Sequence, residues 1–427
     1  MEISLKACFG HPLLDVMNFL NEVVLRHPGA VSFAPGRPAE RHFDVEGSLA
    51  KAPAYVAYRA AARGWPESAV WNDLGQYNKT NGIMNELVAA ELLADEGIVA
   101  APEAIMVTHG CQEGMLVLLL GLFEPAADVL LVSDPTYIGI TGLAAIAGIE
   151  TVPVPMEEGE LRLDLLAAAI AAVRARGKRP RGFYHIPDFN NPLGTQLPLA
   201  DRHLLLELLR EQQVLCFEDN PYGMFVFDGE PLPTLKQLDR HGSVIYLGSF
   251  SKSLYPGLRL GYLVADQEVA APDGRRVPLA VELSKVKSLT TVTTSPLLQA
   301  VAGAILLENG GSLRSVVAAK LPFYKANRDR MLECLERELG DAAGISWNRP
   351  AGGFFMTVDL PFVFDDAAVE VCARDYGVIV CPVSYFALLP GRERQVRLSF
   401  SYVTPEQIEE GIGRFARFVR GRAAEAA

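Results

Sequence analysis

The sequence lacks the marks of several protein classes. No two of its six cysteines form a CxxC pair, and no histidines and cysteines have zinc-ligand spacing, which argues against a disulfide scaffold and a metal site. The longest apolar stretches, residues 115–123 and 296–307, fall well short of the ~20 residues that a membrane-spanning helix needs. The first residues show no basic segment followed by an apolar one, as a secretion signal would. We therefore expect a cytoplasmic protein with reduced cysteines that binds no metal and no membrane.

Long basic runs are also missing. Thirty-nine Lys and Arg stand against 51 Asp and Glu, a formal charge of −12, whereas nucleic-acid-binding proteins usually carry a basic stripe. We therefore expect no nucleic-acid partner. With 50% hydrophobic and 21% charged residues the composition is that of an ordinary globular protein, and 427 residues allow two or three domains.

Short apolar strands alternate with helix-patterned segments through the middle of the chain. Strands that are apolar throughout are typical of a parallel sheet covered by helices on both faces. The sequence therefore predicts an α/β fold, a doubly wound and mostly parallel sheet, in a large domain over residues 48–295. The expected strands are residues 104–107, 128–132, 151–154, 182–186, 214–217, 244–247 and 260–264, and two expected helices are residues 161–175 and 199–212.

The pattern changes after residue 295. It predicts a smaller α+β C-terminal domain over residues 296–427, and residues 1–47 form an N-terminal segment that we expect to pack on this domain. The expected helices are residues 296–308, 312–339 and 405–420, and the expected strands are residues 354–358, 378–380 and 396–400.

A lysine follows one of the expected strands of the large domain. Lys252 ends the segment GSFSK, directly after the strand at 244–247. Functional sites in open α/β sheets gather at the carboxyl ends of the strands, and a lysine held there can lose its proton and form an imine with a carbonyl group. Ser249, Ser251 and Arg259 are donors that suit a phosphate. Taken alone, the segment also fits an ordinary surface loop with a solvated lysine.

Two further strands are followed by polar groups. Asp219 follows the strand at 214–217, and its carboxylate suits a protonated ring nitrogen, while the phenol of Tyr222 can donate to a ring oxygen. Asn191 lies in the turn DFNNPLG that follows the strand at 182–186. A helix cap with a proline turn explains the first pair equally well, and a simple tight turn explains Asn191.

Two segments suggest where a phosphate and a flat ring would bind. Gly110, Cys111 and Gln112 open an apolar helix after a short strand, and the backbone N–H groups at a helix start can bind phosphate. Tyr137 follows the strand at 128–132, and an aromatic side chain at such a place can cover a ring. A plain strand-to-helix turn and a core tyrosine are the alternatives.

One arginine, Arg397, stands inside the apolar strand at 396–400. An arginine in a half-buried strand needs a partner of opposite charge. A substrate carboxylate held by two hydrogen bonds is one candidate, and a structural ion pair is the other.

Together these segments resemble the fold-type I pyridoxal 5′-phosphate (PLP) enzymes, in particular the class I and II aminotransferases of the 2-aminoadipate and kynurenine type. The matching segments are Asn191-Pro192-x-Gly194, Asp219-x-x-Tyr222 and Ser249-x-Ser251-Lys252 with Arg259, and they occur in the order of that family. The resemblance extends over nearly the whole chain. It implies the family's fold, PLP as the cofactor, and an amino acid and a keto acid as the substrates.

The resemblance also implies a role for each matched residue at the cofactor. Lys252 would bind PLP as a Schiff base and move the substrate proton, and Asp219 would pair with the ring nitrogen. Asn191 and Tyr222 would bind the ring oxygen, and Tyr137 would stack on the ring. The residues expected around the cofactor phosphate are Gly110, Cys111, Gln112, Ser249, Ser251 and Arg259.

On the substrate side, the resemblance assigns the α-carboxylate to Arg397 with Asn191. Arg37 lies in the segment that lines the substrate pocket in the family, where it would meet a distal acid or remain a solvated charge. Tyr77 matches a tyrosine that reaches the phosphate of the neighbouring subunit. That match implies a homodimer with shared sites.

The sequence departs from the family pattern in places. The family usually opens the helix after Gly82 with a Leu-Arg pair, which is absent here, and Cys111 stands where serine or alanine is more common. The segment 55–71, with Arg59 and Arg63, looks longer than usual. We expect these departures to affect the substrate side rather than the proton chemistry.

Three functions are weighed. An aminotransferase that moves an amino group between an L-amino acid and a 2-keto acid is the first. A different PLP reaction on the same scaffold is the alternative: β- or γ-elimination or replacement, decarboxylation, or bond-forming or oxidative chemistry in specialised biosynthesis. A PLP-sensing module of a transcription regulator is disfavoured, because the matching segments begin near residue 32 and leave no room for a helix-turn-helix unit.

Overall fold

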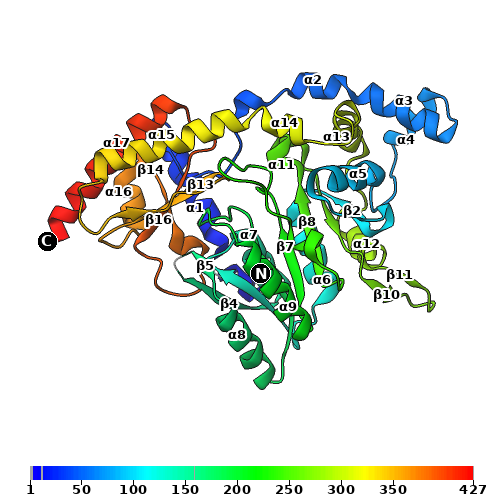
Figure 1. The fold of residues 1–427 in the computed structure, drawn as a ribbon, viewed down its shortest axis with the longest axis horizontal. Coiled ribbons are helices and arrows are strands. Elements are labelled where there is room, and N and C mark those ends of the chain that lie inside the picture. The colour runs from blue at the N-terminus through cyan, green and yellow to red at the C-terminus, as the bar shows by residue number, and fades with distance from the viewer. Residues whose placement is uncertain (1–2, 11–12, 158, 427) are drawn as a thin grey trace.

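An eight-stranded sheet runs through the large part of the molecule (Figure 1). The structure is a computed structural model that describes residues 3–10, 13–157 and 159–426. All neighbouring strands are parallel except at β9 and β5, so the predicted doubly wound and mostly parallel sheet is confirmed. In spatial order the strands are β2 (Ile105–Thr108), β9 (Gly261–Val264), β8 (Val244–Ser249), β7 (Leu215–Asp219), β6 (Arg179–His185), β3 (Asp128–Asp134), β4 (Glu150–Glu157) and β5 (Glu160–Leu161).

The antiparallel direction of β9 follows from its short connection. Only residues 250–260 separate it from β8, and they contain one four-residue helix, α11 (Phe250–Ser253), and a 3-10 turn. A parallel return needs a crossover of a dozen or more residues. The chain therefore turns back directly, and this turn carries Lys252.

Helices cover both faces of the sheet because successive side chains of each strand point to opposite faces. On β3, Leu130 and Val132 pack with α6 (Cys111–Leu122) and α7 (Ile138–Ala147), while Leu131 packs with α8 (Leu163–Ala175) and α9 (Leu199–Glu211). The remaining helices around this sheet are α2 (Val45–Ala50), α3 (Ala52–Arg63), α4 (Glu67–Leu74), α5 (Asn85–Glu96), α10 (Leu235–Leu238), α12 (Leu279–Thr290) and α13 (Pro296–Glu308).

A second, four-stranded antiparallel sheet lies toward the C-terminus, beneath the long helices α15 and α17 (Figure 1). Its strands are β12 (Ser346–Trp347), β13 (Phe355–Asp359), β16 (Gln395–Ser399) and β15 (Cys381–Pro382). The helices beside it are α15 (Leu321–Leu339), α16 (Asp366–Tyr376) and α17 (Pro405–Ala426).

The single helix expected over residues 312–339 is wrong. The structure has two helices there, α14 (Arg314–Ala318) and α15, with a break at Ala319 and Lys320. Pro322 explains the break, because its nitrogen has no hydrogen to donate to the carbonyl of Ala318 and its ring would clash with that group. Proline is well tolerated in the first turn of α15, where it lies.

The N-terminal residues join the second sheet region. After α1 (Leu13–Arg26), the strand β1 (Val31–Ser32) pairs in parallel with β14 (Val378–Ile379). Elsewhere in the chain, β10 (Glu268–Ala270) and β11 (Arg276–Pro278) form a small antiparallel hairpin. The division of the chain after residues 47 and 295 stays a prediction. None of the described helices is long and apolar enough to span a membrane.

Candidate active site

The carboxyl ends of β6, β7 and β8 lie side by side, because these strands are parallel neighbours. The segments that follow them meet at one edge of the large sheet and, with β16 of the small sheet, line a cavity of about 370 Å³. The predicted site residues that line this cavity are Arg37, Cys111, Gln112, Tyr137, Asn191, Asp219, Tyr222, Ser249, Ser251, Lys252, Arg259 and Arg397.

Lys252 lies in this cavity at the end of the turn after β8. The turn begins at Ser249, whose Oγ accepts a hydrogen bond from the backbone N–H of Ser251 at 3.2 Å. The Lys252 ammonium donates to the carbonyl of Gly36 at 2.8 Å and has no carboxylate within ion-pair distance in the described chain. Desolvation lowers the pKa of Lys252 to about 8, and the charges of Arg397 and Arg259 add to this while Asp219 opposes it. About a tenth of the amine is therefore neutral at pH 7.

Asp219, the last residue of β7, is almost completely buried, with 3% of its surface exposed. One carboxylate oxygen accepts a hydrogen bond from the hydroxyl of Tyr184 at 2.5 Å, and the other accepts one from the thiol of Cys111 at 3.4 Å. Burial raises the pKa of Asp219 to about 6, and these two hydrogen bonds and the charge of Lys252 oppose the rise. The carboxylate is therefore held as an anion at neutral pH and can pair with a cationic ring nitrogen.

Tyr222 lines the same cavity as Lys252 and Asp219. Its ring centroid is 5.9 Å from the Lys252 nitrogen, and the ring packs edge-on against Phe355. Burial raises the pKa of Tyr222 far above its ordinary value. The phenol consequently stays protonated and can serve as a hydrogen-bond donor.

A positively charged recess lies where α6 begins. Gly110 has φ +72°, and a Cβ atom on it would lie 2.4 Å from the Arg259 guanidinium. Gly261 permits the same close approach on the other side, since its Cβ would lie 2.7 Å from the nitrogen of Cys111. Arg259 has no carboxylate partner among the described residues. A cation without a counterion beside the N-terminus of a twelve-residue helix fits the phosphate of the implied cofactor.

Arg397 enters the cavity from the middle of β16. Its guanidinium donates to the side-chain oxygen of Asn191 at 2.5 Å and to the carbonyl of Ala34, and it lies between the rings of Phe355 and Phe386 at 4.5 and 4.7 Å. Its Nε is buried and has no partner. No carboxylate pairs with it anywhere in the described chain, so the structural ion pair weighed above is absent. A buried, unpaired guanidinium facing a cavity suits the carboxylate of a ligand.

Two of the predicted site residues, Arg37 and Tyr77, are largely exposed to solvent. The guanidinium of Arg37 lies 4.8 Å above the ring of Tyr402 and 3.9 Å from the carboxylate of Glu40, and more than half of its side chain is exposed. Tyr77 lies outside the cavity and is 81% exposed. The single chain therefore does not bring Tyr77 to the other site residues.

Some residues of the site were not predicted. Tyr184 is an interior residue of β6, and an aromatic residue in an apolar strand has no sequence signal that distinguishes a hydrogen-bond donor from a core side chain. Glu113 accepts from the backbone N–H of His109 at 2.6 Å and pairs with the buried Lys287 at 2.8 Å. This pair holds the turn before α6, and its partners are too distant in sequence for the spacing to show it.

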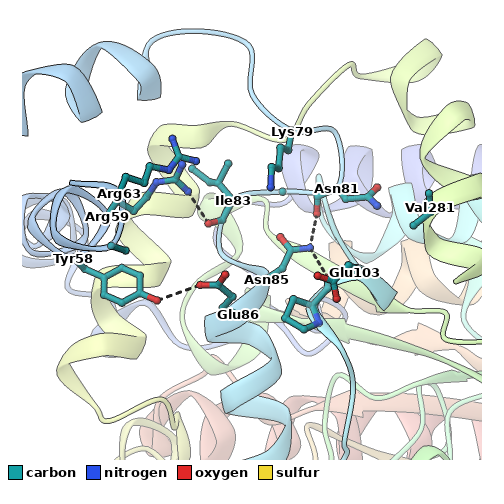
Figure 2. A pocket seen from close by; sticks show the side chains of 13 residues that line it. Tyr58, Arg59, Arg63, Lys79, Asn81, Ile83, Asn85, Glu86, Glu103 and Val281 are labelled. Carbon is teal, nitrogen blue, oxygen red and sulfur yellow. Dashed lines mark hydrogen bonds between the residues drawn. The ribbon is translucent and has the colours of Figure 1, made fainter. Parts of the chain in front are cut away.

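Two departures from the family pattern, the segment 55–71 and the start of α5, contribute residues to a second cavity, of about 420 Å³, shown in Figure 2. The third departure, Cys111, lines the cavity with Lys252. The second cavity is lined by Arg59 and Arg63 of α3 and by the start of α5. Arg59 donates to the carbonyl of Ile83 at 2.9 Å and lies 3.4 Å from the carboxylate of Asp73. Arg59 of α3 therefore places a cation beside the start of α5. The first residues of α5 themselves include no arginine, whereas the family usually has a Leu-Arg pair there. Of the described residues, none lines both this cavity and the one with Lys252.

The buried histidine at the end of β6, His185, should make the fold sensitive to acid. Burial lowers the pKa of His185 to about 3, whereas the unfolded chain takes up a proton near pH 6.5. Because the unfolded state binds more protons between these values, His185 should cost about 2 kcal/mol of stability when the pH falls from 7 to 5. Urea unfolding at both pH values should show this loss, and the His185→Gln variant should show a loss smaller by that amount. Equal losses in the two proteins would contradict the prediction.

Comparisons with known proteins agree with this geometry. A family model described as aminotransferase class I and II matches residues 74–415. The (S)-3,5-dihydroxyphenylglycine transaminase of Amycolatopsis orientalis is 42% identical over 411 residues, which cover 96% of this chain and 92% of that protein. Aromatic-amino-acid aminotransferase 1 of Thermococcus litoralis is 32% identical over 394 residues, covering 91% and 88%. The α-aminoadipate aminotransferase of Thermus thermophilus, solved with N-(5′-phosphopyridoxyl)-L-leucine, superposes with a TM-score of 0.76 at 30% identity and covers 94% and 95% of the two chains.

Proposed function

This chain belongs to the class I and II aminotransferase family, and we propose that it takes the amino group from an aromatic L-amino acid with Lys252 as its catalytic base. It is a PLP-dependent enzyme that moves amino groups between an amino acid and a 2-keto acid. When bound, PLP supplies an electron-withdrawing ring that stabilises negative charge at the substrate's Cα atom. The roles of the individual side chains and the nature of the amino acid are the proposal.

The cavity offers one group for each part of the cofactor. Arg259 and the start of α6 would hold the phosphate, Lys252 would hold the aldehyde carbon, and Asp219 would keep the ring nitrogen protonated. Tyr137 also lines the cavity, as a residue that stacks on the ring must. Supporting this assignment, Arg259 is an unpaired cation beside Gly110, where a larger residue would fill the recess.

Proton transfer is assigned to Lys252. With a pKa of about 8 its amine is partly neutral at physiological pH, and a base is most effective when its pKa lies near the working pH. The carbonyl of Gly36 and the ring of Tyr222 limit where the amine can go. Lys252 would therefore take the proton from Cα and, as an ammonium, deliver it to the former aldehyde carbon of the cofactor.

The substrate's α-carboxylate is assigned to Arg397. Lysine at this position would keep the positive charge but lose the planar pair of N–H donors that a carboxylate needs. Arg397→Lys should therefore raise the KM for the amino acid about 100-fold, with a smaller change in kcat. Steady-state kinetics at varied amino acid concentration measure this. Arg394→Lys is the control, because Arg394 is exposed and its side chain donates to the carbonyl of Pro361. An unchanged KM in Arg397→Lys would contradict the assignment.

The preference for an aromatic side chain rests on the apolar residues that share the cavity with Arg397. Val24, Ile138 and Phe386 line it, and Arg37, the remaining cation on the substrate side, is engaged with a tyrosine ring and largely exposed. Such walls suit an aromatic ring better than a distal carboxylate. Two relatives named for an arylglycine and for aromatic amino acids support the same class.

A half-reaction with the PLP-loaded enzyme tests the substrate class. Arylglycines, phenylalanine, tyrosine, 2-aminoadipate, glutamate and leucine are added singly without a keto acid, and the cofactor absorbance and the keto acid product are followed. We expect aromatic amino acids to react at least about tenfold faster than 2-aminoadipate and glutamate. A faster reaction with either acidic amino acid would overturn the proposed substrate class. Products that lack a leaving group would point to a different PLP reaction.

The enzyme is further proposed to be a cytoplasmic homodimer in which Tyr77 of one copy reaches the cavity of the other. The exposure of Tyr77 supports the shared site of a homodimer. The six unpaired cysteines support a cytoplasmic location. Mixed dimers test the sharing of sites. If Tyr77→Phe and Lys252→Ala are separately impaired, a mixture refolded together should recover activity, because one hybrid site has both residues intact. No recovery in a verified mixed dimer would contradict shared sites.

A further inference from the structure

Both oxygens of the buried Asp219 carboxylate already have a donor in the protein. Tyr184 donates to one at 2.5 Å, and the thiol of Cys111, the first residue of α6, donates to the other at 3.4 Å. Cys111 was predicted at the phosphate. That prediction concerns its backbone N–H group, and its side-chain hydrogen bond goes to the carboxylate that would face the ring nitrogen.

The thiol is held in its donor form. Burial raises the pKa of Cys111 well above its ordinary value, and the adjacent charge of Asp219 raises it further. The sulfur therefore keeps its proton, which points at Asp219. A thiol is a weak donor, so it orients the carboxylate while withdrawing less negative charge from it than a hydroxyl group such as that of Tyr184 does.

We propose that Cys111 is a positioning residue that, with Tyr184, fixes the orientation and the basicity of the Asp219 carboxylate toward the cofactor ring. This inference rests on the proposed role of Asp219 as partner of the ring nitrogen. The weak donor leaves the carboxylate more basic than two hydroxyl donors would, which favours a firmly protonated ring.

Several other titratable groups lie near Asp219 and influence the pKa of its carboxyl group. Burial raises the pKa of Asp219, the hydrogen bonds from Tyr184 and Cys111 lower it, and the charge of Lys252 lowers it by a smaller amount. The titratable groups that face Asp219 are Tyr184 on β6, Cys111 on α6, Lys252 on α11, Tyr137 after β3 and Tyr222 after β7.

Infrared spectroscopy of the holoenzyme tests the hydrogen bond directly. The S–H stretching band that disappears in Cys111→Ala belongs to this thiol. We expect that band to move to higher frequency in Asp219→Asn, because the charged acceptor is lost. A band that is unaffected by Asp219→Asn would overturn the proposed contact. Asp219→Asn keeps the thiol, so the frequency shift is measured in a protein that still contains Cys111.

Titration of the Asp219 carboxyl tests the effect on basicity. In the full-length chain freed of cofactor, selectively ¹³C-labelled aspartate gives a carboxyl resonance for Asp219 that is identified by its loss in Asp219→Asn. Removal of a donor to the charged form should raise the midpoint from about 6, by about half a pH unit in Cys111→Ala and by about one unit in Tyr184→Phe. Cys216→Ala is the matched control, since it removes a buried thiol from the same strand as Asp219 and should leave the midpoint in place. A midpoint that is unchanged or lowered in Cys111→Ala would overturn the inference.

The loaded Asp219→Asn variant separates this inference from the proposed function. If it keeps wild-type turnover, Asp219 is not the partner of the ring, and the proposed assignment of the site fails. If it loses turnover while Cys111→Ala leaves the carboxyl titration unchanged, only the role of Cys111 falls.

Discussion

Replacing Lys252 by alanine should lower the turnover number for amino-group transfer by about four orders of magnitude. Lys252 is the amine in the cavity whose pKa, about 8, permits a neutral form, and a positioned base contributes up to about 10⁴-fold to a proton transfer. The loss should fall on kcat, because the substrate carboxylate is assigned to Arg397 and not to Lys252. Single-turnover measurements with saturating amino acid give this number.

Two comparisons make the result specific for Lys252. Lys285→Ala removes a lysine whose side chain is largely exposed on α12, and it should leave turnover unchanged. Methylamine is small enough to enter a cavity of about 370 Å³ and should restore part of the turnover of Lys252→Ala in proportion to its concentration. Full turnover in Lys252→Ala without added amine would exclude Lys252 as the base.

Asp219→Asn should lower kcat by about 10³-fold and leave the KM for the amino acid nearly unchanged. The amide has the same shape as the carboxylate but no charge, so it cannot keep a ring nitrogen protonated, and the loss of one preorganised electrostatic partner costs about 10²–10³-fold. The amide oxygen can still accept a hydrogen bond from Tyr184, and the amide fills the same space, which limits structural change. Steady-state kinetics and circular dichroism of the variant measure both effects.

The exposed Asp273 provides the matched control, because its carboxylate pairs with Arg275 in a surface turn. Asp273→Asn should behave as the wild type. The two site variants should also differ in kind, since Arg397→Lys acts on KM and Asp219→Asn acts on kcat. A rise in KM as the main effect of Asp219→Asn would show that this carboxylate contacts the substrate and not the cofactor.

Much of the fold was predictable because its strands are short, apolar and separated by helix-patterned segments. The strands at 128–132, 182–186, 214–217 and 244–247 are all present, each with ends shifted by a few residues at most. The helix break at Lys320 was missed although Pro322 was visible. A proline in the first turn of a helix and one that interrupts a helix look alike until the hydrogen bonds around it are known.

The convergence of Lys252, Asp219 and Asn191 also followed from local sequence. Each lies at the end of a strand or in the segment that follows it, and parallel neighbours bring their carboxyl ends to one edge of a sheet. Other parts of the site depend on chains that are distant in sequence. Arg397 and Asn191 are 206 positions apart, and only the packing of the small sheet on the large one shows that this arginine has no acidic partner.

By itself, the sequence determined the sheet, the order of its motifs and the residue types at the strand ends, because these depend on side-chain periodicity and on groups within a few residues of each other. The tertiary structure alone decided which groups those residues touch. Tyr184 could have been a core side chain, Cys111 could have faced a phosphate, and Arg37 could have faced a distal acid. The positions of these side chains follow from rotamers and long-range packing, which no local pattern encodes. Tyr184 and Cys111 lower the pKa of Asp219 through their hydrogen bonds, and the position of Arg37 leaves the substrate side of the cavity largely apolar.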